Sequence, residues 1–241
     1  MTNSSHNKDD VSTVTAVFDA GDDIVNLLIP QYSLAGKINA EAIVAAAAAL
    51  TGEWGLFSLD MELPESGFIE NDEIDQVLFQ GEGAVWLFVE KSAVEAGLAN
   101  IDLPNVSAAF ARNASGLGQG PYPPLSVPDR HLPDEWSPHA CQRYRGNIAA
   151  IAARHNLDGC ETVFACAVAT AKLIVITADI VDPAITTQLA LEMMIGVSRL
   201  APLDMAKIPA VAPAVPPANT ISMAGANDNI AGKTELHLVD N

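Results

Sequence analysis

The side chains best able to do chemistry gather between residues 129 and 141. Imidazole nitrogens, carboxylate oxygens and a thiol sulfur are ligands that Zn²⁺ and Fe²⁺ accept. A histidine that titrates near neutrality can also act as a general acid or base, which makes His131, Glu135 and His139 the catalytic candidates. The metal-ligand candidates are His131, Asp134, Glu135, His139 and Cys141.

The spacing of these residues argues against a metal centre. It matches no zinc signature, neither H-E-x-x-H nor a paired C-x-x-C. Pro133 and Pro138 also dictate the backbone, so helix geometry does not bring the side chains together. We therefore interpret the segment as a polar, proline-bent loop that Trp136 anchors to the core, and we expect neither a metal nor a cofactor.

Two arginines follow on one predicted helix. Arg143 and Arg154 are eleven residues apart, which returns them to the same helix face. They are candidates for binding a carboxylate or phosphate group of a ligand. In a chain with a net charge of -18, however, internal salt bridges or contacts with the acidic first segment are simpler. We favour that interpretation for both side chains.

A run of acidic residues precedes this region. A Ca²⁺ loop needs oxygen ligands at regular spacing around a glycine, and Pro64 and Gly67 interrupt that pattern. We interpret the run as a solvated loop; the alternative is an acidic patch that docks a basic partner. The run consists of Asp60, Glu62, Glu65, Glu70, Asp72, Glu73 and Asp75.

Helices are expected to dominate the chain after residue 138. Apolar residues recur at helical spacing over residues 141–155, and residues 160–180 form a long apolar stretch. Asp182 and Pro183 are an N-cap followed by proline at the first helical position, which predicts a helix to about Leu200. These three helices would form a C-terminal unit.

The first segment has a mixed pattern. Residues 13–29 alternate around a Gly-Asp turn, which is typical of a hairpin. Residues 77–89 favour a second hairpin, and a single helix over 83–99 competes with it. Asn39 predicts the N-cap of a helix to Leu50, with Gly52 after its end.

The expected fold class is α+β, helix-dominated: a mixed N-terminal segment with short strands, followed by a three-helix unit. The alternative is a mainly α protein throughout. Composition shifts and proline clusters set the boundaries. They give a disordered N-terminus over 1–10, the mixed segment over 11–112, a Gly/Pro-rich connector over 113–138, the helical unit over 139–200, and an Ala/Pro-rich, mostly disordered tail over 201–241.

Charge restricts the classes of partner. The chain has 30 acidic and 12 basic residues, so it repels phosphate backbones and anionic lipid. We expect neither nucleic acid nor a membrane as a partner. The amino terminus lacks the pattern of a secretory signal, and three cysteines are too few for a disulfide framework. We expect a soluble protein in the reducing cytoplasm.

The last helix suggests a function, because its apolar residues extend beyond one face. We expect a non-catalytic acidic protein that acts through self-association or a protein partner. The interface candidates are Ile185, Leu189, Met193 and Met194. The alternative is an enzyme of unknown reaction class, with a His/carboxylate site near residues 129–145 between the two folded segments.

Overall fold

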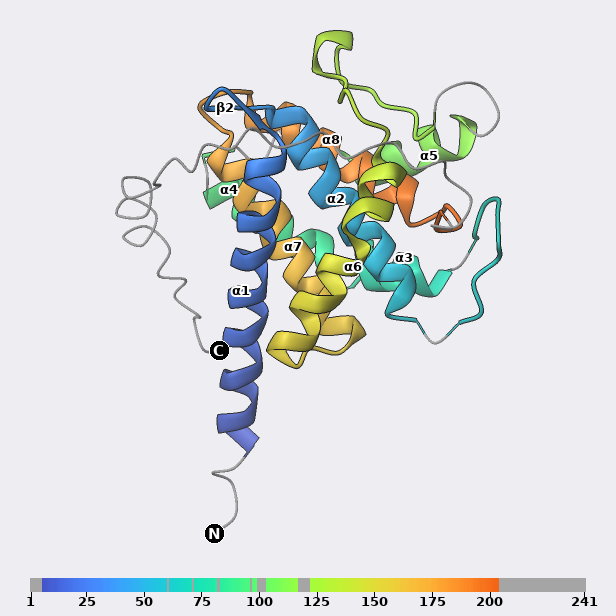
Figure 1. Cartoon of the computed structure of the whole chain (residues 1–241). Coiled ribbons are helices and arrows are strands. Elements are labelled where there is room, and N and C mark those ends of the chain that lie inside the picture. The colour runs from blue at the N-terminus through green and yellow to red at the C-terminus, as the bar shows by residue number, and fades with distance from the viewer. Residues whose placement is uncertain are drawn as a thin grey trace. The chain divides into compact units, whose positions relative to one another are not determined.

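The computed structural model describes residues 6–203, apart from 60, 71, 82, 96, 99–102 and 117–121. These residues form eight α-helices and one antiparallel two-stranded hairpin (Figure 1), so the helix-dominated α+β class is confirmed. The elements are α1 (His6–Gln31), β1 (Ser33–Leu34), β2 (Lys37–Ile38), α2 (Ala40–Phe57), α3 (Asp72–Phe79), α4 (Val85–Glu95), α5 (Val106–Gly116), the 3-10 turn η2 (Asp129–His131), α6 (Ser137–His155), α7 (Gly159–Ile176) and α8 (Pro183–Val197).

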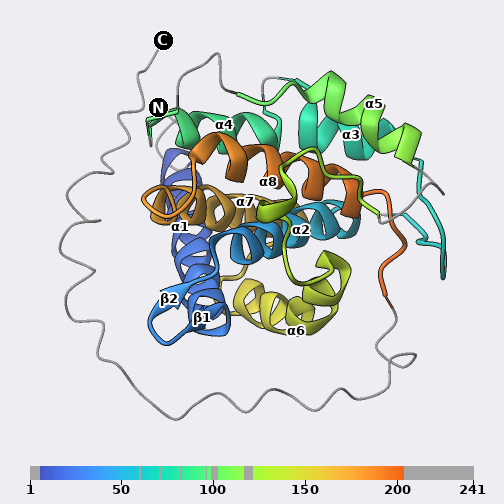
Figure 2. The same cartoon turned by 90° about the horizontal axis from the view of Figure 1, so that it is seen from above.

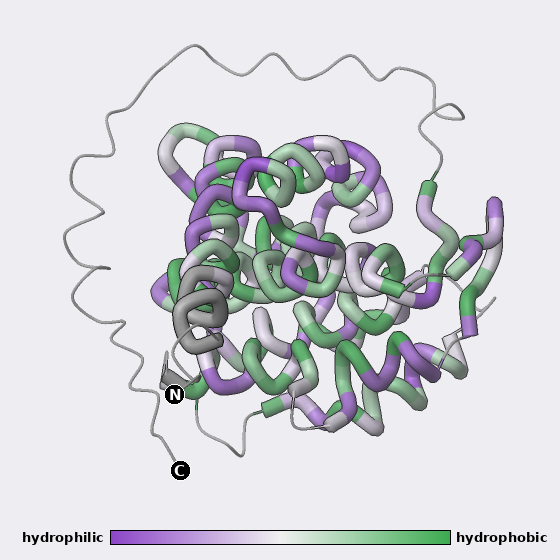
Figure 3. The backbone as a smooth tube through the Cα atoms, turned by 90° about the horizontal axis from the view of Figure 1, so that it is seen from below, coloured by the Kyte–Doolittle hydropathy of each residue, from purple (hydrophilic) through white to green (hydrophobic). Residues whose placement is uncertain are grey.

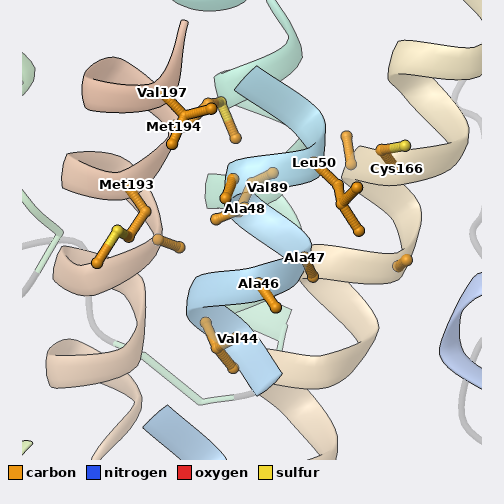
Figure 4. Packing of buried hydrophobic residues seen from close by; sticks show 14 of the residues in the cluster. Val44, Ala46, Ala47, Ala48, Leu50, Val89, Cys166, Met193, Met194 and Val197 are labelled. Atoms are coloured by element: carbon orange, nitrogen blue, oxygen red, sulfur yellow. The ribbon is translucent and has the colours of Figure 1, made fainter. Parts of the chain in front are cut away.

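Helix α2 is the centre of the core. Figure 2 shows it beside α7, with α6 and α8 on either side. Its alanines keep the helix thin, so neighbours pack against it all round. Figure 4 shows the result: Ala46 and Leu50 of α2 lie between Met193 of α8 and Cys166 of α7.

Three helix starts follow from local capping. Asn39 Oδ1 accepts a hydrogen bond from Ala42 N at 3.1 Å, and Asp182 Oδ1 accepts one from Ala184 N at 2.9 Å, so both predicted N-caps are confirmed. Asp158 and Glu161 form a reciprocal capping box at the start of α7. Helix α2 does not stop near Leu50 as expected, but continues through Gly52 to Phe57.

Both predicted hairpins are wrong. Residues 13–29 lie inside α1. Gly21 is therefore not a turn residue but a point of close helix packing, since a Cβ there would lie 2.4 Å from Val168 Cγ1 of α7. Residues 77–79 end α3, and residues 85–89 open α4, close to the helical alternative. The hairpin in the described part of the chain is β1–β2, where Ala35 and Gly36 take the left-handed conformation of a tight turn.

The chain ends differ from the expected boundaries where they can be compared. Residues 6–10 belong to α1 in place of a disordered terminus. Ala201 N donates to Gly67 O at 2.9 Å, and Leu203 O accepts from Arg145 Nη1 at 3.1 Å. The rest of the predicted tail, 204–241, lies outside the described residues.

One hydrophobic core joins segments from the whole described chain. It includes residues of the predicted mixed segment and of the predicted helical unit, because α2 packs against both α7 and α8. In Figure 3 the colour changes between hydrophobic and hydrophilic within single helix turns, as in helices with one buried face. Helices α2 and α7 are long and apolar enough to cross a membrane, but most of each is buried among other helices, which is usual for core helices.

Candidate functional site

The catalytic and metal candidates of residues 129–141 are held in separate structural pairs. Arg130 Nε donates to His131 Nε2 at 3.0 Å, which leaves the His131 Nδ1–H to donate to Glu41 Oε1 at 2.7 Å. The His139 ring instead packs edge-on against Trp136, 4.9 Å between centroids. Cys141 is fully buried, and burial raises the pKa of its thiol.

The carboxylates of this loop also bind structural partners. Glu135 accepts a hydrogen bond from the Tyr32 hydroxyl at 2.6 Å and one from Arg143. Burial and the Glu135 carboxylate raise the pKa of Tyr32, so its hydroxyl stays a donor. Asp134 Oδ2 accepts from Asn39 Nδ2 at 3.1 Å. Among the residues that the structure describes, no three His, Cys, Asp or Glu side chains are grouped as a metal would require.

Arg143 and Arg154 pair with different carboxylates of the protein. Arg143 of α6 pairs with Glu135 of the loop before that helix, while Arg154 Nη2 lies 2.6 Å from Asp23 Oδ2 of α1. The expected internal salt bridges are therefore present. His155 Nε2 also reaches Asp23, at 2.7 Å.

The interface candidates of α8 are core residues, which corrects the sequence-based expectation. Leu189 and Met194 are completely buried and Met193 is 3% exposed. Ile185 is half-buried and packs against the same core. The apolar sector of α8 is wide because α2, α4 and α5 all pack on it. Within the described part of the chain, every residue of α8 is buried or half-buried.

A buried carboxylate on α8 holds the proline-rich connector in place. Glu192 is 1% exposed and accepts hydrogen bonds from Arg112 of α5 and from both the backbone and the hydroxyl of Ser126. Gly196, one turn later, has Pro123 against it: a Cβ there would lie 2.2 Å from the Pro123 Cβ. These contacts hold the described residues 122–136 of the connector against α8, which the connector crosses in Figure 2.

Beside this anchor lies a cavity of about 330 Å³, between the segment before α3, helix α5 and the residues that follow α8. Three aromatic rings line it: Phe68, Phe110 and Tyr122. The rings of Phe68 and Tyr122 meet edge to face at 4.9 Å between centroids. Phe68 is 46% exposed, so an aromatic wall of the cavity faces solvent.

The polar groups of the cavity are Arg199, Asn113 and Glu70. Arg199 Nη2 donates to both oxygens of Asp75, at 2.9 and 2.6 Å, and its guanidinium carbon lies 5.0 Å from the Phe110 centroid. The Arg199 Nε is buried without a hydrogen-bond partner. An unmatched buried donor is costly, and a ligand acceptor can satisfy it.

Tyr122 sets the orientation of Asn113. Burial raises the pKa of Tyr122 to about 12, so its hydroxyl remains protonated at neutral pH and donates to Asn113 Oδ1. Among the lining residues, Arg199 thus carries a buried N–H group that no described residue accepts.

Sequence reasoning missed this cavity because its parts lie far apart in the chain. Glu70 stood in the acidic run and Tyr122 in the proline-rich connector, but no short motif joins them to Arg199. Backbone pairing of Phe68 with Leu200 and of Ile69 with Arg199 brings Glu70 to this site, and the Tyr122 hydroxyl reaches Asn113 of α5.

No protein-family model matches the chain, and neither a curated protein nor a solved structure matches it.

Proposed function

We propose that the chain is a non-catalytic binding protein whose cavity receives a segment of a protein partner. The observation that carries the proposal is the coincidence of a solvent-facing aromatic wall, at Phe68 and Tyr122, with the unmatched donor of Arg199. Aromatic residues and arginine are the side chains that most often dominate the binding energy of protein interfaces.

The size of the cavity suits side chains better than a large cofactor. Its 330 Å³ stands at the small end of the range of about 300–1,000 Å³ that small-molecule pockets occupy. One or two apolar side chains of a partner fill such a space. Each large one removed from water contributes about 1.5–3 kcal/mol.

The anchoring of the cavity also supports binding. Glu192 and Gly196 fix the connector that carries Tyr122, so one wall is held in place before a partner arrives. Preorganised walls lower the entropic cost of association. By contrast, the catalytic candidates His131 and Glu135 are already paired with Glu41 and Tyr32.

The test is a selection for peptides that enter the cavity. A phage-displayed library of random peptides is panned against the full chain, and selected peptides are measured against two variants. Ala114→Trp places an indole at an exposed lining position of α5, whereas Ala153→Trp places one at an exposed position of α6. We expect Ala114→Trp to weaken binding by about tenfold or more and Ala153→Trp to leave it unchanged.

Thermal melts verify that both variants fold. If the library yields no binder, or if its peptides bind Ala114→Trp as well as the native chain, the cavity is not the binding site and the proposal is wrong.

A further inference from the structure

We infer that the partner segment entering this cavity is proline-rich and carries a basic residue beside its prolines. The inference rests on the proposed function and names the chemistry of its ligand. Three properties of the cavity lead to it: its unmatched donor, its aromatic rings and the charge at its edge.

The unmatched polar atom of the lining side chains is a donor, because Arg199 Nε is buried without an acceptor. A ligand that brings carbonyl oxygens but few N–H groups satisfies this donor without burying new donors of its own. Proline is the residue with a backbone carbonyl and no N–H, so a proline-rich segment meets this requirement best.

The aromatic rings provide the matching apolar contact. Phe68 and Tyr122 meet edge to face, and Phe68 is 46% exposed, so a ring surface is open to a ligand. Aromatic-lined grooves are the usual receptors for proline-rich segments, which keep an extended conformation before binding and so lose little entropy.

The charge around the cavity favours a basic neighbour of the prolines. Glu70 lines the cavity with an exposed side chain, and α5 ends nearby at Gly116, where a helix carries partial negative charge. Asp72 and Glu73, two residues and three residues further on, are exposed as well.

The positive charge of Arg199 does not reverse the negative charge around the cavity. Its guanidinium is within 2.6 Å of Asp75, so a carboxylate of the protein already compensates its charge. A free anion would have to compete with Asp75 and approach a chain whose net charge is -18. The cavity therefore suits the neutral carbonyls of a partner, with a cation at its edge.

Fluorescence polarisation with defined peptides tests the inference. The probe is a fluorescein-labelled peptide, Ala-Pro-Pro-Leu-Pro-Pro-Arg-Lys, titrated with the full chain. One comparison peptide has alanine for every proline, and a second has glutamate for arginine and lysine. We expect each comparison peptide to bind about tenfold more weakly or worse. Added salt should weaken binding of the basic peptide, because it screens the attraction between the peptide and the acidic edge of the cavity.

Protein variants locate the contact. Phe68→Ala removes an exposed ring without opening the core, and we expect it to lower the affinity for the proline peptide by about tenfold. Ala114→Trp should do the same, whereas Ala153→Trp should not. Equal binding of the proline and alanine peptides would overturn the inference, as would equal binding by Ala114→Trp.

The two proposals fail separately. If library peptides enter the cavity but show no enrichment in proline, the inference about the ligand is wrong and the proposed function stands. If no peptide of either experiment is sensitive to Ala114→Trp, both are wrong.

Discussion

Two buried carboxylates, Glu53 and Glu192, are paired with arginines from other elements. Glu53 of α2 is 2% exposed and pairs with Arg145 of α6 at 2.6 Å. Glu192 of α8 pairs with Arg112 of α5 at 2.7 Å. A buried charge without its partner is strongly destabilising, so these pairs tie α5 and α6 to the two innermost helices.

Removing Glu192 should loosen the cavity as well as the fold. We expect Glu192→Ala to lower the free energy of unfolding by about 2–4 kcal/mol. This is less than the loss of a fully buried ion pair costs, because solvent partly screens the exposed Arg112. Chemical denaturation measures this change. Exposed Glu65→Ala is the control and should change stability by less than about 0.5 kcal/mol. Equal effects of the two variants would show that the Glu192 pairs are not structural.

Glu53 predicts a pH dependence with a definite sign. Burial raises its pKa above 4.5, and Arg145 opposes the rise only in part. Between 4.5 and the higher pKa of the folded protein, the folded state binds more protons than the unfolded state, so this group costs stability as pH rises.

We expect the stability of the native chain, measured relative to Glu53→Gln, to fall as pH rises from 4.5. Urea unfolding of both proteins across pH 4.5 to 8 gives the difference. If the stability of the native chain relative to Glu53→Gln instead increases as pH rises, this account is contradicted.

At the scale of elements, the helix N-caps could be predicted from the sequence, whereas the packing roles of the glycines could not. Asn39 and Asp182 act through neighbours in sequence, so their roles could be read locally. Gly21 and Gly52 act through partners more than a hundred residues away, Val168 and Met194, and a local pattern reads such glycines as turns or ends. The local pattern therefore predicts two strands where α1 lies and an end of α2 near Leu50, seven residues before Phe57.

Gly52 should therefore be intolerant of a methyl group. A Cβ there would lie 2.5 Å from the Met194 carbonyl oxygen, which is backbone and cannot rotate away. We expect Gly52→Ala to destabilise the fold by about 1–3 kcal/mol through forced separation of α2 and α8. Calorimetric melting temperatures measure the effect.

Gly146→Ala is the matched control, because it lies in the exposed face of α6 with nothing within 4 Å of the new methyl group. It should stabilise the chain by about 0.5–1 kcal/mol through helix propensity. The interpretation of close packing fails if both alanine variants are stabilised.

For the whole molecule, the central question is which surfaces remain after folding. The sequence indicated correctly that α8 carries more apolar residues than an ordinary surface helix, but not that α2, α4 and α5 cover them. That coverage depends on tertiary arrangement. The cavity at Phe68, Tyr122 and Arg199 was unpredictable for the same reason.

A substitution at Met194 tests whether α8 is a core helix or an interface. Met194 is completely buried, so we expect Met194→Asp to lower the free energy of unfolding by at least about 3 kcal/mol, because it buries a polar group without a partner. Ile180→Asp is the control at a position that is 54% exposed. A folded Met194→Asp variant whose only change is loss of self-association, seen by light scattering, would restore α8 as the interface.

The central claim is that a partner segment enters the cavity beside α5 and α8. The most direct measurement is nuclear magnetic resonance of the isotope-labelled full chain, titrated with the tightest peptide from the library. We predict amide shifts concentrated at residues 68–70, 110–114, 122 and 199, and their loss in Ala114→Trp. Shifts centred on another surface, or shifts that persist in Ala114→Trp, would contradict the claim.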